Sequence, residues 1–174
     1  MYWFTGDEHY GHANIIEFCN RPFRDVHHMN KELILRHNEV VAHNDVVVHA
    51  GDFTLHGSAR KAQEFIERLN GKHVFVRGSH DKWMDRSYHE RWEKTIENQK
   101  VVVDHYAGRV WPKSHFNSWQ LYGHSHGGLP PEGKQWDVGV DNNNFYPVSF
   151  EQIVQIMESC PDNLNYIKKG DRRR

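Results

Sequence analysis

Aspartate and histidine recur directly after short apolar segments of this sequence, at positions that suit metal-ion or proton-transfer chemistry. The 174 residues include 15 histidines, an unusually large share. Four apolar segments run into a glycine, and a fifth at 101–103 leads to His105. Without cysteine among them, these groups favour Mn²⁺, Fe or Zn²⁺ over an iron–sulfur cluster or a calcium cage. The groups that follow the four glycines are Asp7-Glu8-His9, Asp52, Ser79-His80-Asp81 and His124-Ser125-His126.

The elements that must position these groups alternate between strand and helix, which is typical of an α/β domain. Helices are expected from a cap at Asp25, from Ser58 to Gly71, and from a Ser149-Gln152 capping box to Pro161. In an open α/β sheet the carboxyl ends of the strands form the ligand crevice, so the five polar segments are expected to converge there. Apolar runs predict strands at 2–5, 46–50, 73–76, 101–103 and 119–122, with a weaker one at 138–140.

Length and composition predict one domain over residues 1–166, followed by a basic C-terminal tail at 167–174. A chain of this length buries about 70 % of its unfolded surface around one core. The chain has 22 Lys and Arg and 23 Asp and Glu. Its charges nearly cancel, so it lacks the basic surface expected of a protein that binds duplex nucleic acid without sequence preference. The distant Cys19 and Cys160 indicate no disulfide framework. The absence of a long apolar run predicts a cytoplasmic protein without membrane partners.

The polar groups are numerous enough for two metal ions. One aspartate can bridge ions about 3.5–4 Å apart, and the other ligands then divide between them. Such a pair lowers the pKa of a shared water and neutralises charge on phosphate oxygens. This set of side chains therefore favours nucleophilic displacement at the phosphorus of a phosphate ester.

The motifs resemble those of the calcineurin-like metallophosphoesterases, in the same order along the chain. Further likeness to a compact bacterial and phage branch extends the resemblance over residues 1 to about 157. It implies a sandwich of two mixed β-sheets flanked by helices. The motifs that carry it are Asp7-x-His9, Gly11-His12-x-Asn14, Gly51-Asp52, Gly78-Ser79-His80-Asp81, His105-Tyr106, Gly123-His124-x-His126 and Asp137-Val-Gly-Val-Asp141.

Site roles follow from the resemblance. It implies that Asp52 bridges two divalent ions, with Mn²⁺ favoured and Fe, Zn²⁺ or Ni²⁺ as alternatives. Ser79 stands where the family usually has an asparagine ligand, which predicts a weaker second site. His80 would protonate the leaving oxygen, and Asp81 could orient its imidazole. The remaining ligands would be Asp7, His9 and His126 on the first ion, and His105 and His124 on the second.

Other residues leave alternatives open. His115 competes with His105 for the same role, although it follows a loop. His12 and Arg109 are candidates for substrate phosphate contacts, and Trp111 is assigned to packing rather than to stacking on substrate. His49 could form a hydrogen bond to a metal-binding residue without binding the metal itself. Solvated or capping roles are expected for His27, His28, His37, His43, His56, His73 and His89.

The resulting prediction is a phosphodiesterase for small phosphodiesters, in which a metal-bridging hydroxide attacks phosphorus. A phosphomonoesterase or a nuclease on the same site is the nearest alternative, and nucleic acid is not favoured because the basic footprint is weak. A second alternative is a non-catalytic scaffold protein of the same fold. The replacement of the usual asparagine ligand by Ser79 supports it.

Overall fold

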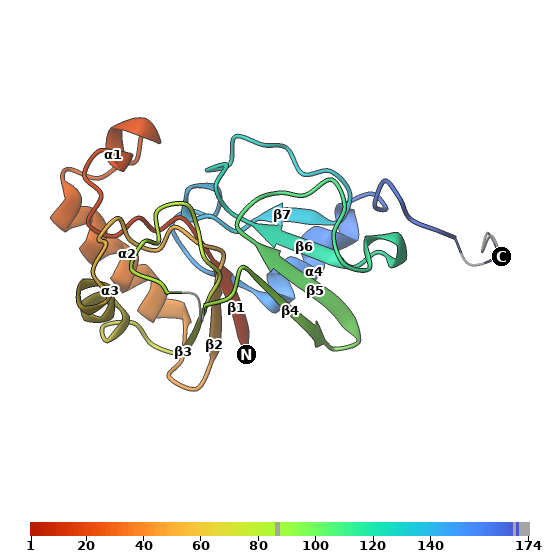
Figure 1. The fold of residues 1–174 in the computed structure, drawn as a ribbon, viewed down its shortest axis with the longest axis horizontal. Helices are drawn as coiled ribbons and strands as arrows, with labels where there is room; N and C mark the ends of the chain where they lie inside the picture. Colours follow the sequence, from red (N-terminus) through yellow and green to blue (C-terminus); the bar gives the residue numbers. More distant parts are fainter. Residues whose placement is uncertain (86–87, 169, 171–174) are drawn as a thin grey trace.

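The computed structural model describes residues 1–85, 88–168 and 170, which form two four-stranded mixed sheets (Figure 1). In the first sheet, the order is β3-β2-β1-β8, with β1 to β3 parallel and β8 antiparallel to β1. In the second sheet, the order is β4-β5-β6-β7, with β4 and β5 antiparallel and the rest parallel. The bounds are β1 (Tyr2–Thr5), β2 (Val46–His49), β3 (Lys72–Phe75), β4 (Arg91–Ile96), β5 (Gln99–Asp104), β6 (Trp119–Tyr122), β7 (Gln135–Asp137) and β8 (Val148–Ser149).

Helices flank the sheets, as the sequence predicts. Asp25 caps α2 by accepting a 2.8 Å hydrogen bond from the backbone of His28. Ser149 and Gln152 form the expected capping box at α4. None of the helices in the described part of the chain has the length and apolar character of a membrane span. The helices are α1 (Ile15–Phe18), α2 (Val26–Val40), α3 (Ala59–Ile66) and α4 (Phe150–Ser159), with short 3-10 turns at η1 (Ser114–Phe116) and η2 (Val140–Asn142).

Two apolar clusters hold the layers together. One lies between the sheets and α4, where Phe4, Leu121 and Ile153 are fully buried. The other joins the first sheet to α2 and α3 through Met29 and Phe53. Burial of these side chains contributes about 1.5–3 kcal/mol each. The strands of the first sheet are therefore packed against the second sheet on one face and against α2 and α3 on the other, which fixes the positions of their ends.

The structure differs from the sequence prediction at several elements. The strand expected at 138–140 lies instead at 135–137, where its residues pair with β6, and Val140 already begins η2. Gly139 bridges to Gly6 and so links the two sheets. The β4 strand was not predicted, because its charged residues give no apolar run. Instead, Arg91 bonds Asp104 across the β4–β5 pair at 2.6 Å. Most of the predicted basic tail lies outside the described residues.

Candidate metal centre

The five polar segments meet at the carboxyl ends of the parallel strands, as predicted. Segments after β1 and β2 continue side by side, because the backbone N–H of Asp7 donates to Gly51 and that of His9 donates to Asp52, at 2.9 and 3.0 Å. Across the sheets, the backbone N–H of His124 donates to the Asp7 carboxylate at 2.8 Å. The hydrogen bond from the His124 backbone to the Asp7 side chain thus joins residues separated by 117 positions.

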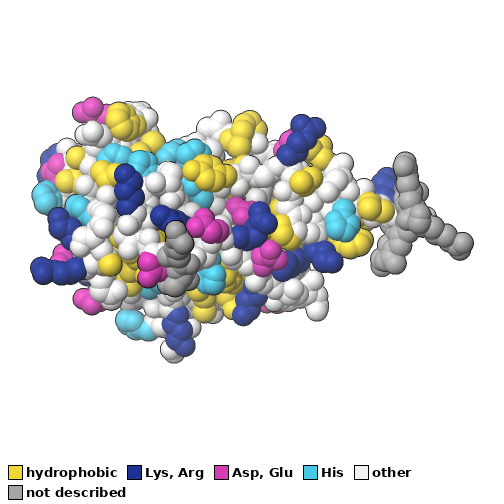
Figure 2. Space-filling view, viewed as in Figure 1, with side chains coloured by type: hydrophobic (Ala, Val, Ile, Leu, Met, Phe, Trp, Pro, Cys, Tyr) yellow, Lys and Arg dark blue, Asp and Glu magenta, His cyan; other side chains and the backbone are white. Residues whose placement is uncertain are grey.

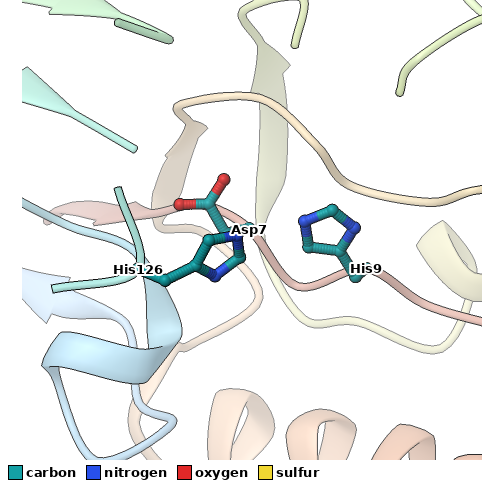
Figure 3. Close-up of side chains that lie close together, drawn as sticks. All are labelled: Asp7, His9 and His126. Atoms are coloured by element: carbon teal, nitrogen blue, oxygen red, sulfur yellow. The ribbon is translucent and has the colours of Figure 1, made fainter. Parts of the chain in front are cut away.

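Asp7, His9 and His126 form one group of potential metal ligands. One ligand atom from each lies within 4.8 Å of the others. Figure 3 shows Asp7 and His9 on the segment that follows β1, with His126 reaching them from a separate loop. Asp7 and His9 are buried, and His126 is half-buried. This set offers one carboxylate and two imidazoles, which suits a transition metal or zinc.

Asp52, His105 and His124 form a second group with the same 4.8 Å spacing. Its carboxylate lies between the two groups, because Oδ2 is 3.7 Å from Nε2 of His9 and 3.4 Å from Nε2 of His105. Asp52 is buried, whereas His124 is exposed. The second group therefore opens toward solvent.

Unpartnered buried atoms in these groups fit metal ions. Among the described residues, buried polar atoms without a hydrogen-bond partner include Oδ1 of Asp7, Nε2 of His9 and Nε2 of His105. Leaving a buried polar atom without a partner costs about 1–3 kcal/mol. All three atoms belong to the two ligand groups, so bound cations would account for them.

Three of the histidines are held through Nδ1, which leaves Nε2 for an ion. Nδ1 of His105 donates to the Ala50 carbonyl at 2.9 Å, and Nδ1 of His126 lies 2.7 Å from Asp141. Nδ1 of His9 lies 3.3 Å from Nδ1 of His12. Hydrogen bonds of this kind fix the tautomer and the ring orientation of metal-binding histidines.

Electrostatics of the centre also favour cations. Burial raises the pKa of Asp7 to about 7, against the attraction of His126. Burial lowers the pKa of His9 to about 3, so its imidazole is neutral at pH 7. Burial opposes ionisation of Asp52, but the nearby His105 ring and the hydrogen bond from the backbone N–H of His80 outweigh it and hold its pKa below the usual value. A neutral imidazole beside a buried carboxylate is the state in which both bind metal.

The ligand segments adopt an unusual backbone conformation. A positive φ places these non-glycine residues in the left-handed region, which costs roughly 1–2 kcal/mol per residue. Strain of this kind gathers at functional sites, where the surrounding structure maintains it. The residues concerned are Asp7, His9, Asp52, His124 and His126, with φ between 47° and 67°.

Asp81 has a different role from the one predicted. Its buried carboxylate accepts from the backbone N–H groups of Asp52, Phe53 and Gly78 at 2.7 to 3.0 Å, and from the indole of Trp83 at 2.9 Å. Among the described contacts, none joins it to the His80 ring. The prediction that Asp81 orients His80 is therefore wrong, because backbone donors occupy both carboxylate oxygens. Asp81 supports the Asp52 segment.

His80, Ser79 and His12 line the opening of the centre. The backbone N–H of His80 donates to Oδ1 of Asp52 at 2.8 Å, and its ring lies 5.2 Å from that of His9. The Ser79 hydroxyl lies 3.1 Å from Oδ2 of Asp52. The His12 ring lies 5.8 Å from that of His80. Figure 2 shows histidine side chains gathered along the upper edge of this face.

Several other residues that the sequence suggested as candidates lie apart from the two groups. Arg109 is exposed, and no hydrogen bond or ion pair joins it to the centre within the described residues. His115 lies in η1, outside the ligand groups found there. Trp111 is buried and donates to the Ser118 carbonyl at 3.1 Å, as expected of a packing residue. His105 is thus the better placed of the two competing histidines.

A buried histidine network lies behind the ligand segments. Nδ1 of His49 contacts Glu8 at 2.7 Å, and Nε2 contacts His73 at 3.0 Å. His37 is 4 % exposed and donates to the Asn70 carbonyl at 2.8 Å. The solvated role expected for His37 is therefore wrong, whereas His73 is half-buried beside His49. Packing of α2 against the first sheet encloses them, which a local pattern does not show.

Arg21 supports the centre and was not identified from the sequence. Its buried guanidinium donates to both Asp141 oxygens at 2.8 and 2.7 Å, and to the backbone carbonyls of Asp7 and Glu8. Asp141 stands out in the sequence only as part of a motif. A lone arginine before a proline carries no signal, because its partner lies 120 positions away.

Comparison with known proteins shows that the chain belongs to the calcineurin-like phosphoesterase family, whose model matches residues 2–169. An uncharacterized protein of Methanocaldococcus jannaschii is 37% identical over 166 residues, which are 90% of each chain. The crystal structure of a protein of unknown function from Aquifex aeolicus has a TM-score of 0.69 at 21% identity, covering 90% of this chain and 98% of its own, which shows the shared fold. The family and the two ligand groups support a metal-dependent phosphoric ester hydrolase.

Proposed function

We propose that the protein is a phosphodiesterase that acts on small phosphodiesters with two divalent ions, Mn²⁺ being the first candidate. The observation that carries the proposal is the position of Asp52, whose Oδ2 lies between the unpartnered Nε2 atoms of His9 and His105. A carboxylate in that position suits a bridging ligand. Asp7, His9, Asp52 and His126 would hold one ion, and Asp52, His105 and His124 the other.

The ions would supply an activated water and neutralise charge on the phosphate oxygens. His80 is attached through its backbone to Asp52, and its half-buried ring lies at the opening. A protonated His80 ring would therefore donate to the departing oxygen. If Nε2 of His9 is a ligand, its Nδ1 donates to Nδ1 of His12, which leaves the proton of His12 on Nε2. That proton would be available to a phosphate oxygen.

Charge at the centre favours a diester over a monoester. A monoester dianion brings an additional negative charge that a nearby cation would have to balance. Arg21 is the arginine found beside the ligands among the described residues, and Asp141 already neutralises it at 2.7 Å. A diester carries a single charge on its phosphate, which two ions can balance. The exposed Ser79 and His124 leave the opening accessible to a small ester.

Hydrolysis of an aryl diester and the matching aryl monoester by the manganese-loaded protein tests the proposal. We expect a higher kcat/KM for the diester and loss of both activities in Asp52→Asn. A higher value for the monoester would overturn the diester assignment in favour of a monoesterase. A protein that binds no metal and hydrolyses neither ester would instead be a scaffold.

The role of His80 is tested through the leaving group. Protonation helps an alkoxide far more than a stabilised aryloxide, and general acid catalysis contributes about 10²–10⁴ in rate. We expect His80→Gln to slow an alkyl diester much more than a nitrophenyl diester, with metal content retained. The exposed His43 provides a matched control, and His43→Gln should change neither rate. Equal losses on the two esters would contradict the acid role.

A further inference from the structure

A cavity lies beside the metal centre, on the side of the molecule that carries α2 and α3. Its volume is about 470 Å³, within the range of about 300–1,000 Å³ that small-ligand sites occupy. Lys and Arg side chains lie close to histidines on this side of the molecule (Figure 2). The lining includes Lys31, Arg68, His27, His56, Asn30 and Phe65, and none of its described residues is acidic.

The two cations of the cavity are not neutralised. Lys31 and Arg68 form no ion pair with any residue that the structure describes, and both side chains are exposed. By contrast, Arg60 on α3 pairs with Glu64 at 3.4 Å, and Arg36 on α2 lies 4.0 Å from Glu32. The cavity is therefore a local concentration of positive charge on a chain whose net charge is −1. Such a concavity attracts anions.

The floor of the cavity is built from the segments that carry the metal ligands. The segments after β1 and β2 are joined where the Thr54 hydroxyl donates to the Tyr10 carbonyl at 2.7 Å. That hydroxyl also accepts from the backbone N–H of His56 at 3.2 Å. Asn30 of α2 accepts from the backbone N–H of Gly11 at 3.1 Å. The cavity is thus held at a fixed place relative to the metal ligands on the same two segments.

Gly11 permits the close approach of these two segments. Its φ is +77°, and a Cβ atom there would overlap the imidazole of His56. Gly11 lines the cavity, while the next residue, His12, contacts His9 and His80 in the centre. The segment at Gly11 and His12 therefore lies between the cavity and the metal centre. A ligand that extends past His12 would reach both.

We propose that this cavity binds a second phosphate group of the substrate, so that the preferred phosphodiester carries a terminal phosphate on the arm it retains. The inference rests on the proposed phosphodiesterase activity. Lys31 and Arg68 supply the charge that a phosphate dianion requires, and an arginine can bind two of its oxygens at once. The ring of Phe65 lies parallel to that of His56, with 6.4 Å between centroids, and offers an apolar wall to the connecting arm.

A pair of nitrophenyl diesters tests the inference, one with a 2-phosphoethyl arm and one with a 2-hydroxyethyl arm. We expect the phosphorylated ester to have the lower KM in the metal-loaded native protein. Lys31→Gln combined with Arg68→Gln should raise that KM about tenfold, equivalent to about 1.4 kcal/mol. It should leave kcat and the KM of the 2-hydroxyethyl ester unchanged. Lys61→Gln, an exposed residue of α3 outside the cavity, is the matched control. Equal KM changes for the two esters would overturn the assignment.

A binding measurement separates this inference from the proposed function. Inorganic phosphate added to the zinc-loaded protein should shift the NMR signals of the Gly11 amide and the His56 ring, and the double variant should lose these shifts. Shifts without hydrolysis of either ester would contradict the phosphodiesterase but confirm the anion site. A variant that loses the shifts yet treats the two esters as the native protein does would assign the cavity to free phosphate, and would overturn the substrate role.

Discussion

The carboxylate of Asp81 accepts a 2.7 Å hydrogen bond from the backbone N–H of Asp52. Asp52 is the residue best placed to bridge two ions, and its φ of 55° is unfavourable for a residue with a side chain. The same Asp81 oxygen accepts from Gly78 at 2.9 Å, where a Cβ atom would overlap the Asp52 carboxylate. Asp81 therefore stabilises a strained backbone on which the metal centre depends.

Replacement of Asp81 by Asn should destabilise the metal-free protein. The amide keeps one acceptor oxygen, so some of the backbone N–H groups of Asp52, Phe53 and Gly78 lose their partner. We expect a decrease of about 1–3 kcal/mol in the free energy of unfolding, measured with urea. We also expect weaker metal binding, with no change in the rate ratio between alkyl and aryl esters. A changed ratio would restore the link to His80 that the structure contradicts.

Asp141 should control metal affinity through His126. It accepts from the His126 ring at 2.7 Å and from Arg21, and partners of this kind contribute about 10–100-fold to metal affinity. Asp141→Asn should therefore weaken binding of the ion held by Asp7, His9 and His126, as measured by metal titration. Glu151→Gln, an exposed change on α4, should leave affinity unchanged. Native affinity in Asp141→Asn would show that Asp141 does not position His126.

Much of the architecture could be predicted because its signals are local. The capping box at Ser149 and the apolar strand before Asp52 depend on neighbouring residues, and the carboxyl-end rule then brings the ligand segments together. Buried partners could not be predicted in this way. Arg21 meets Asp141 only after both sheets assemble, and Asp81 meets the Asp52 backbone for the same reason. Amphipathic β4 is stabilised by pairing with β5, which an apolar pattern does not show.

His124 should reveal the strain of the ligand segments. Its φ is 67°, its side chain is exposed, and its backbone N–H donates to Asp7. Glycine adopts this conformation without cost, whereas alanine does not, so His124→Gly should be more stable than His124→Ala by about 1 kcal/mol. Urea unfolding of the two metal-free variants measures the difference. Both should bind less metal, and equal stability would mean that this position carries no strain.

His37 should make the protein less stable in mild acid. Burial lowers its pKa to about 4, whereas a histidine in an unfolded chain has a pKa of about 6.5. Above about pH 6.5 both states are neutral, so His37 has no effect on the pH dependence there. As the pH falls from 6.5 toward 4, the unfolded chain takes up the proton first, and stability decreases by up to about 1.4 kcal/mol per pH unit.

A non-titrating replacement isolates this contribution. The amide of His37→Gln can still donate to the Asn70 carbonyl, which His37 contacts at 2.8 Å. Between pH 7 and pH 5, the native metal-free protein should lose about 2 kcal/mol more of its free energy of unfolding than the variant does. Urea titrations at several pH values measure both losses. His49 and His73 are present in both proteins, so the difference between the two pH profiles reports His37 together with its coupling to these neighbours. Parallel pH profiles would contradict a neutral buried His37.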